Sequence, residues 1–205
     1  MADAFERVAN GELKRLIINM PPRHTKSEFA SYLFPAWFLG RYPEKKIIQT
    51  AHTAELAVGF GRKVRNLISQ EDFQAVFPGI ELSSDSKAAG RWNTNKRGDY
   101  FAIGVGGAVT GKGADVLIID DPHSEQEAAL GAYNPEVYDK VYEWYTSGPR
   151  QRLQPGGSII IVMTRWSTRD LTGKIIKSVT QKEGVDDWEV IELPAIMPSG
   201  EPLWP

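Results

Sequence analysis

The chain has 205 residues, of which 41% are hydrophobic and 24% charged, a balance typical of one globular domain that buries a core. The absence of cysteine excludes disulfides, thiolate metal sites and a cysteine nucleophile. Neither a signal peptide nor an apolar run of about 18 residues is present, so we expect an intracellular, soluble α/β domain spanning residues 1–205. A formal net charge of −2 gives no general attraction to nucleic acid, so contact with DNA requires local basic patches.

Residues 16–27, LIINMPPRHTKS, are the most informative segment. An apolar run stops at two prolines and ends in Lys26-Ser27 just before a helical pattern. A strand, a tight loop and Lys-Ser at a helix N-terminus hold nucleotide phosphates: the loop N–H groups converge on them, the lysine neutralises them and the hydroxyl ligates Mg²⁺. The consensus G-x-x-x-x-G-K-[ST] is not met, because Met20 and Thr25 stand at the glycine positions. Taken alone, the segment fits a simple strand-to-helix turn with a surface lysine equally well.

Apolar runs alternate with helical patterns along the chain, which indicates successive β-α units on a parallel sheet. We predict strands at about 15–20, 46–51, 116–120, 158–164 and 188–193. We predict helices over 54–70, from Asn134-Pro135 onward, and over 168–177. The basic run at 62–65 in the first of these helices is interpreted as a solvated face.

Residues 90–115 differ in composition from the preceding segments, because they include seven glycines. A short apolar run at 100–105 predicts a β-excursion at the sheet edge. Arg91, Lys96 and Arg97 precede it, and the last two also fit a flexible surface hairpin. Lys112 lies in a Gly-flanked loop, at the opposite end of the next strand from the carboxylates described below. We therefore expect Lys112 to point away from its own nucleotide and toward a neighbouring subunit.

The apolar run at 116–119 ends in Asp120-Asp121. A strand without alternation is typical of a parallel sheet buried on both faces, and its C-terminal end lies where α/β folds bind ligands. One carboxylate can hold Mg²⁺ through water, while the other orients or deprotonates an attacking water. The alternative is a pair of aspartates that cap a loop.

The strand at 158–163 ends in Thr164-Arg165-Trp166-Ser167. A polar residue at this strand tip, beside the Asp-Asp strand, can hydrogen-bond the γ-phosphate or the attacking water and report hydrolysis to the rest of the molecule. A Thr/Ser cap for the following helix explains the same residues equally well.

Five segments, taken in this order, resemble the ATPase domain of the large terminase subunit of tailed bacteriophages: PPRHTKSEFASYLFPAW, GVGGAVTGKGADVLIIDDPHSEQEA, EWYTSGPRQRLQPGG, VMTRWSTRDLTG and LPAIMPSGEPLWP. The resemblance covers nearly the whole chain. It implies a three-layer α/β/α P-loop NTPase of the ASCE, RecA-like type with a mainly parallel sheet. It also implies a motor that pumps double-stranded DNA through a portal into a procapsid. Such motors work as rings with a small terminase subunit, in the host cytoplasm.

The resemblance implies roles for individual residues. The Walker A loop falls on Pro22, Arg23, His24, Thr25, Lys26 and Ser27, the Walker B strand on residues 116–120, and the coupling motif on Thr164 and Arg165. Lys26 would bind the phosphates of ATP, Ser27 and Asp120 would hold Mg²⁺, Asp121 would position or activate water, and Arg23 would contact the γ-phosphate. Lys112 falls near the trans-acting arginine finger, with Arg91 and Arg97 as substitutes.

The chain departs from the family pattern in three ways. Lys112 keeps the charge of the arginine finger but not its bidentate guanidinium. Asp121 stands where many such motors have glutamate, so slow hydrolysis by the isolated chain is expected. The RNase H-like nuclease that follows in large terminases is missing, so we expect an excised ATPase domain without nuclease activity, monomeric in isolation. A helicase-like DNA translocase and a nucleotide-binding assembly module with little turnover are the alternatives.

Overall fold

A computed structural model describes residues 1–181 and 186–204, except for the side chains of residues 86 and 87. Within these residues, eight strands form one sheet in the order β3-β4-β5-β2-β6-β7-β1-β8. The strands are β1 (Arg15–Asn19), β2 (Lys46–Ala51), β3 (Leu82–Ala88), β4 (Arg91–Thr94), β5 (Asp99–Gly104), β6 (Ala114–Asp120), β7 (Leu153–Met163) and β8 (Glu189–Glu192). The six strands from β5 to β8 in this order are parallel, and β3 and β4 are antiparallel additions.

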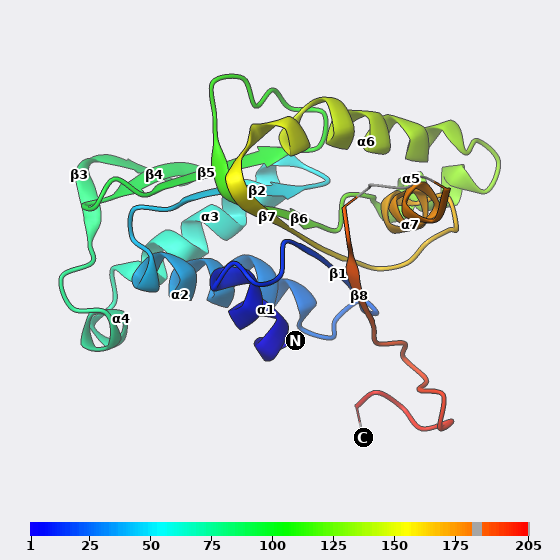
Figure 1. The fold of residues 1–205 in the computed structure, drawn as a ribbon, viewed down its shortest axis with the longest axis horizontal. Helices are drawn as coiled ribbons and strands as arrows, with labels where there is room; N and C mark the ends of the chain where they lie inside the picture. Colours follow the sequence, from blue (N-terminus) through cyan, green and yellow to red (C-terminus); the bar gives the residue numbers. More distant parts are fainter. Residues whose placement is uncertain (182–185, 205) are drawn as a thin grey trace.

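Helices cover both faces of the sheet (Figure 1). They are α1 (Ala2–Ala9), α2 (Phe34–Arg41), α3 (Ala54–Ile68), α4 (Glu71–Val76), α5 (Glu125–Gly131), α6 (Glu136–Ser147) and α7 (Leu171–Gln181). A π-helical turn, η1 (Glu28–Leu33), precedes α2, and a 3₁₀ turn, η2 (Pro149–Arg152), precedes β7. No helix in the described part of the chain is both long and apolar enough to cross a membrane.

Alternate residues of the central strands enter two separate cores, as the two-residue period of a strand requires. Leu16, Ile18 and Ile118 pack with α1, α2 and α3 on one face. Ile17 and Leu117 pack with α6 and α7 on the other. All five are fully buried, and this explains why the sequence of these strands shows unbroken apolar runs. The expected three-layer α/β/α architecture is confirmed.

The expected strands and helices are found with small shifts of their ends. The helix expected over 168–177 begins at Leu171, because Asp170 accepts the N–H of Gly173 and thereby caps the first turn. The helix expected from Asn134-Pro135 begins at Glu136, whose N–H is bound by the Asn134 side chain.

The expected edge position of residues 100–105 is wrong. β5 lies between β4 and β2, and β3 forms the edge. The reason is packing: Trp92 of β4 and Tyr100 of β5 stack with ring centroids 4.7 Å apart, and both are fully buried. Trp92 also donates its indole N–H to the carbonyl of Gly61 in α3, where an added Cβ would lie 2.5 Å from the Ala89 carbonyl oxygen. The added hairpin β3–β4 thus shields β5.

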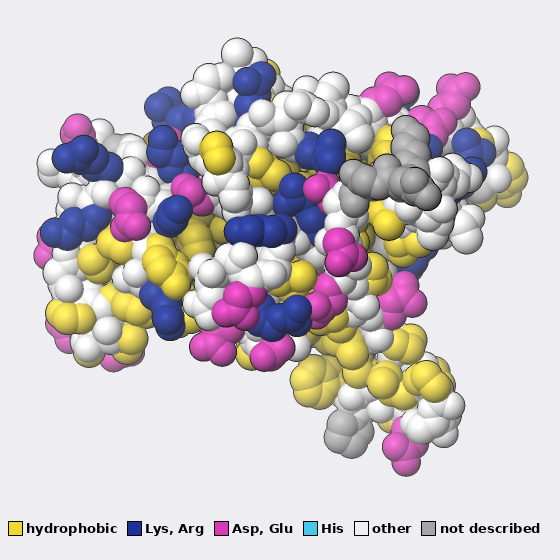
Figure 2. Space-filling model, viewed as in Figure 1, with side chains coloured by type: hydrophobic (Ala, Val, Ile, Leu, Met, Phe, Trp, Pro, Cys, Tyr) yellow, Lys and Arg dark blue, Asp and Glu magenta, His cyan; other side chains and the backbone are white. Residues whose placement is uncertain are grey.

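The face drawn in Figure 2 carries interspersed basic and acidic side chains, in keeping with the small net charge. Hydrophobic side chains gather over the C-terminal segment, where Ile196 and Trp204 are exposed.

Candidate nucleotide-binding site

The carboxyl ends of four parallel strands lie side by side at the same end of the sheet. Asn19 of β1 is opposite Met163 of β7, and Asp120 of β6 is opposite both Val162 of β7 and Ala51 of β2. The loop of residues 20–27 follows β1, Asp121 follows β6, and Thr164 follows β7. The topology therefore brings the three motifs found in the sequence to one place.

The loop after β1 contains two non-glycine residues in backbone conformations that favour glycine. Thr25 has a φ of 66° and Arg23 a φ of 61°, both in the left-handed region that favours glycine. Thr25 stands at the second glycine position of the consensus and adopts the conformation that glycine would supply. The loop also holds His24, whose Nδ1 contacts the carbonyl of Pro22, while Pro22, Arg23 and Thr25 are exposed.

Lys26 is buried at the centre of the site, with 5% of its surface exposed. Its Nζ lies 2.8 Å from Oδ2 of Asp121 and donates to Oγ1 of Thr164 over 3.2 Å. The hydroxyl of Thr164 in turn donates to the carbonyl of Met20. One ammonium group thus links the loop after β1 to the tips of β6 and β7.

Asp120 lies beside this lysine with 1% of its surface exposed. Its Oδ1 accepts the hydroxyl of Ser27 over 2.8 Å, and its Oδ2 accepts the hydroxyl of Ser31 over 2.6 Å. Burial, and after it the charge of Asp121, raises the pKa of Asp120 to about 7, against the hydrogen bonds from Ser31 and Ser27 and the attraction of Lys26. A cation at this carboxylate would keep it ionised.

The donor set fits Mg²⁺. Ser27 Oγ and Asp120 Oδ1 are adjacent oxygen atoms at the mouth of the site, and Mg²⁺ binds one or two such groups together with waters and substrate phosphates. Within residues 1–181 and 186–204, no group of three or more His, Cys, Asp or Glu residues has the geometry of a protein-only metal site.

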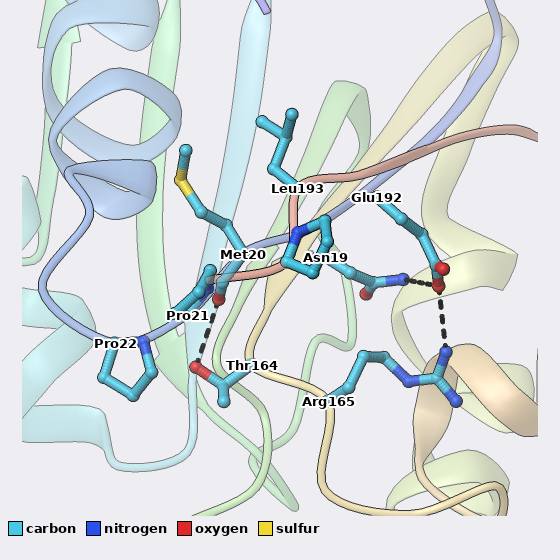
Figure 3. Close-up of a pocket in the computed structure, with 9 residues that line it drawn as sticks. Asn19, Met20, Pro21, Pro22, Thr164, Arg165, Glu192 and Leu193 are labelled. Atoms are coloured by element: carbon cyan, nitrogen blue, oxygen red, sulfur yellow. Dashed lines mark hydrogen bonds and ion pairs between the residues drawn. The ribbon is translucent and has the colours of Figure 1, made fainter. Parts of the chain in front are cut away.

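Two hollows flank Thr164. One, of about 690 Å³, is lined by Asp121, Thr164, Pro22 and residues 123–127 among others. The other, of about 270 Å³, lies between the end of β1 and the segment after β8 (Figure 3). The second is polar where Arg165 donates to Glu192, which also accepts from Asn19. Both hollows are lined by Thr164, which contacts Lys26, and by Pro22 of the loop after β1.

Comparison with solved structures shows which known proteins have a similar fold. The large terminase of the thermophilic bacteriophage D6E superposes over 93% of this chain with a TM-score of 0.53 and 8% sequence identity. The chain has the fold of a phage large terminase. It spans 44% of the length of that protein. The α/β fold expected from the sequence, similar to that of a large terminase, is therefore confirmed.

Two further structures are similar at lower scores. The large terminase ATPase domain of Thermus phage P74-26 covers 94% of this chain and is itself covered to 80%, with a TM-score of 0.49 and 15% identity. The N-terminal domain of the DNA packaging ATPase of bacteriophage phi29 covers 91% and is covered to 93%, with a TM-score of 0.45 and 15% identity. No family model and no curated protein matches the sequence.

Arg165, expected in the coupling motif of the terminase-like fold, extends away from Lys26. It pairs with Asp170 over 3.0 Å and with Glu192 over 3.2 Å, and Figure 3 shows it directed toward Glu192. Asp170 is fully buried and also accepts the N–H groups of Trp166 and Ser167. Arg165 therefore connects the tip of β7 to β8, while Thr164 alone of the two contacts the lysine.

The three basic residues expected to act on a neighbouring subunit lie away from Lys26. Lys112 Nζ is 3.2 Å from Oδ2 of Asp99, the first residue of β5, at the amino ends of the parallel strands. It also lies 5.1 Å from the centroid of the Phe101 ring. Arg91 and Arg97 are exposed on the first residue of β4 and in the turn before β5. The expectation that these residues serve another subunit stays a prediction.

Ser31 and Gln49 are site residues that the sequence analysis missed. Ser31 contacts Asp120, and Gln49 of β2 donates to Ser31. Two signals were present: a second serine four residues after Ser27, and a glutamine that directly follows two isoleucines in a buried strand.

Proposed function

We propose that this chain is the ATPase motor domain of a viral large terminase, which hydrolyses ATP to drive double-stranded DNA into a procapsid. The observation that supports it most is the position of Lys26, whose buried ammonium contacts Asp121 and Thr164 beside the Ser27–Asp120 pair. A lysine, a hydroxyl, two carboxylates and a strand-tip threonine at one sheet edge are the groups that phosphoryl transfer from ATP requires.

Binding of ATP falls to the loop after β1. Lys26 and the N–H groups of residues 22–27 bind the β- and γ-phosphates, and the exposed Arg23 offsets charge that develops on the γ-phosphoryl group. Ser27 and Asp120 would hold Mg²⁺, the second through water, and the ion would supply charge neutralisation at the phosphate oxygens.

Asp121 is the residue that acts on water. Its carboxylate shares the Lys26 ammonium, so the lysine cannot pair fully with phosphate and with Asp121 at once. Transfer of the ammonium to the phosphates leaves Asp121 held by the N–H of Thr164, 2.7 Å away. The carboxylate then orients or deprotonates the attacking water. Thr164 touches both partners of the ion pair, so it is placed to report hydrolysis, and Arg165 passes the change to β8.

The proposal includes partners and place. The domain acts as a homo-oligomeric ring on double-stranded DNA, with the portal protein and the small terminase subunit, at the procapsid vertex in the host cytoplasm. In isolation it is monomeric.

Substitution of Lys26 tests the proposal. Lys26→Ala removes the charge that binds phosphate, and we expect binding of a nonhydrolysable ATP analogue, measured by calorimetry, to be lost. Lys63→Ala is the control, because Lys63 lies on α3 with its side chain 58% exposed. An analogue affinity unchanged by Lys26→Ala would reject the phosphate-binding role of this loop.

A nucleotide-binding assembly module with little turnover is the second candidate. The observation that favours it is the Lys26–Asp121 ion pair, because it withholds the carboxylate placed to act on water unless the lysine moves. Phosphate release should be measured with and without portal, small subunit and DNA. The motor requires stimulation by these partners, whereas the assembly module binds ATP and releases no phosphate under any of these conditions.

A further inference from the structure

Ser31 is the second hydroxyl group on the Asp120 carboxylate. It is fully buried, lies in the π-helical turn η1, and its Oγ is 2.6 Å from Asp120 Oδ2. Ser27, four residues earlier and about one helical turn away, contacts the other oxygen, Oδ1. The two serines therefore divide the carboxylate: the fully buried Ser31 holds Oδ2, and the half-buried Ser27 holds Oδ1.

The direction of the Ser31 hydrogen bond is set by Gln49 of β2. The Gln49 amide donates to Ser31 Oγ over 2.9 Å and to the carbonyl of Thr50 over 3.3 Å. A carbonyl only accepts, so Thr50 requires the amide nitrogen on this side. Ser31 must then accept from Gln49, and its single proton is directed to Asp120.

Burial of the polar side chains of Ser31 and Gln49 costs free energy of folding. Gln49 is fully buried, and its Oε1 has no hydrogen-bond partner among the described residues. A buried acceptor without a partner lowers the stability of the fold, and hydrophobic residues at these positions would avoid this cost. Buried polar groups in such a strand call for a role, and the atom they reach is a carboxylate oxygen of Asp120.

We propose that Ser31, oriented by Gln49, is a positioning residue that fixes the Asp120 carboxylate so that Oδ1 and the Ser27 hydroxyl remain together for Mg²⁺. The inference rests on the proposed function, in which Ser27 and Asp120 hold the metal. Groups that orient metal ligands commonly contribute 10- to 100-fold to metal affinity. Ser31 acts through Asp120 in this arrangement, because it is fully buried and bonds Oδ2, the carboxylate oxygen that does not contact Ser27.

The test is a Mg²⁺ titration of the affinity for a nonhydrolysable ATP analogue, with an EDTA arm for metal-free binding. For Ser31→Ala we expect the Mg²⁺ concentration at half-effect to rise about 10-fold or more, with unchanged affinity in EDTA. Gln49→Met, which keeps the volume and removes the donor, should shift it in the same direction by a smaller factor. Ser158→Ala is the matched control, because Ser158 is 3% exposed and bonds a backbone carbonyl, that of Leu13, on β7 away from the site.

The outcomes separate the inference from the function. A normal Mg²⁺ dependence in folded Ser31→Ala overturns the role of Ser31, and a shift in Ser31→Ala without one in Gln49→Met overturns that of Gln49. If Ser31→Ala shows no cooperative unfolding transition, Gln49→Met alone decides. If the unmodified chain binds the analogue no better with Mg²⁺ than with EDTA, the proposed function itself fails.

Discussion

The backbone of Thr164 holds the carboxylate of Asp121 at the tips of two neighbouring strands. The N–H of Thr164 donates to Asp121 Oδ1 over 2.7 Å, and the N–H of Asp121 donates to the Val162 carbonyl over 2.9 Å. Asp121 has a φ of 38°, in the left-handed region. The first oxygen of its carboxylate is thereby fixed, and Oδ2 is the oxygen that can exchange Lys26 for water.

Asp121→Asn should separate binding from turnover. Asparagine tolerates positive φ as aspartate does, and its oxygen can still accept from Thr164. Loss of the negative charge removes the group that we propose acts on water, so we expect kcat to fall by about 10²- to 10⁴-fold. Analogue affinity should stay the same or rise, because Lys26 no longer shares its charge. Steady-state phosphate release and calorimetry measure the two effects.

Asp115→Asn is the control for this substitution. Asp115 lies near the start of β6, at the opposite end of the strand from Asp121, and pairs with Lys45. A turnover rate for Asp121→Asn within a few-fold of this control would show that another group activates the water.

Much of the site was predictable from the sequence because the carboxyl ends of parallel strands share an edge. Once the apolar runs are assigned to such strands, Lys26, Asp120 and Thr164 must lie close together. The pairing of Lys26 with Asp121, in contrast, depends on which way a long side chain turns, and neither motif spacing nor periodicity determines that.

Other features depend on tertiary packing that the local pattern does not record. The β3 sequence LSSDSKA is polar and shows no apolar face, so nothing in it indicated that it would displace β5 from the edge. Ser31 reaches Asp120 only through the turn η1. Helix α5 was not predicted, although the sequence contains a signal for its start: Ser124 and Glu127 form a capping box.

Thr25→Gly should stabilise the fold slightly. A non-glycine residue at positive φ costs about 1–2 kcal/mol, and the added freedom of glycine in the unfolded chain returns about 0.5–1 kcal/mol of that. We expect the free energy of unfolding to rise by about 0.5–1 kcal/mol in urea titrations. Thr25→Val loses the hydroxyl bonded to the His24 carbonyl as glycine does, but its branched side chain keeps the strain of positive φ, so it should lower this free energy. The reverse order would show that the loop relaxes away from this conformation in solution.

Asp186 should make stability depend on acid pH. It lies between Arg15, 3.0 Å away, and Arg150, 2.8 Å away. Burial alone would raise the pKa of Asp186, but the hydrogen bonds from the two arginines outweigh it and lower the pKa. A carboxyl with a lower pKa in the folded state stabilises above its unfolded pKa of about 3.9, and this contribution is lost as the pH falls through the folded value.

Asp186→Asn should accordingly lower the free energy of unfolding at pH 7 by about 1–2 kcal/mol, with a constant difference between pH 6 and 8. The difference should shrink as the pH falls below about 4. Denaturant titrations across this range measure it, with Asp187→Asn as the control because its neighbour Asp187 is exposed. An equal loss at all pH values would assign the effect to packing rather than charge.

Dependence of hydrolysis on subunit contact is the last prediction. The basic candidates Lys112, Arg91 and Arg97 lie away from the Lys26 site of their own chain. Lys112 is already paired with Asp99 and only 16% of its side chain is exposed, so it must leave this partner to reach another subunit. Arg91 and Arg97 are exposed and need no such release. Specific activity should therefore rise with protein concentration.

Mixtures of two variant subunits identify which basic residue acts on the neighbouring subunit. Each of Lys112→Ala, Arg91→Ala and Arg97→Ala is combined with Asp121→Ala, because one variant can supply the group that the other lacks at a shared site. The pair containing the acting residue should regain part of the activity, since only some interfaces have the right order. A Lys112→Ala chain that only loses stability, without rescue, assigns Lys112 to its ion pair with Asp99. Constant turnover per subunit across a wide concentration range, with no mixture more active than its components, would favour a mechanism within one chain that relies on Arg23.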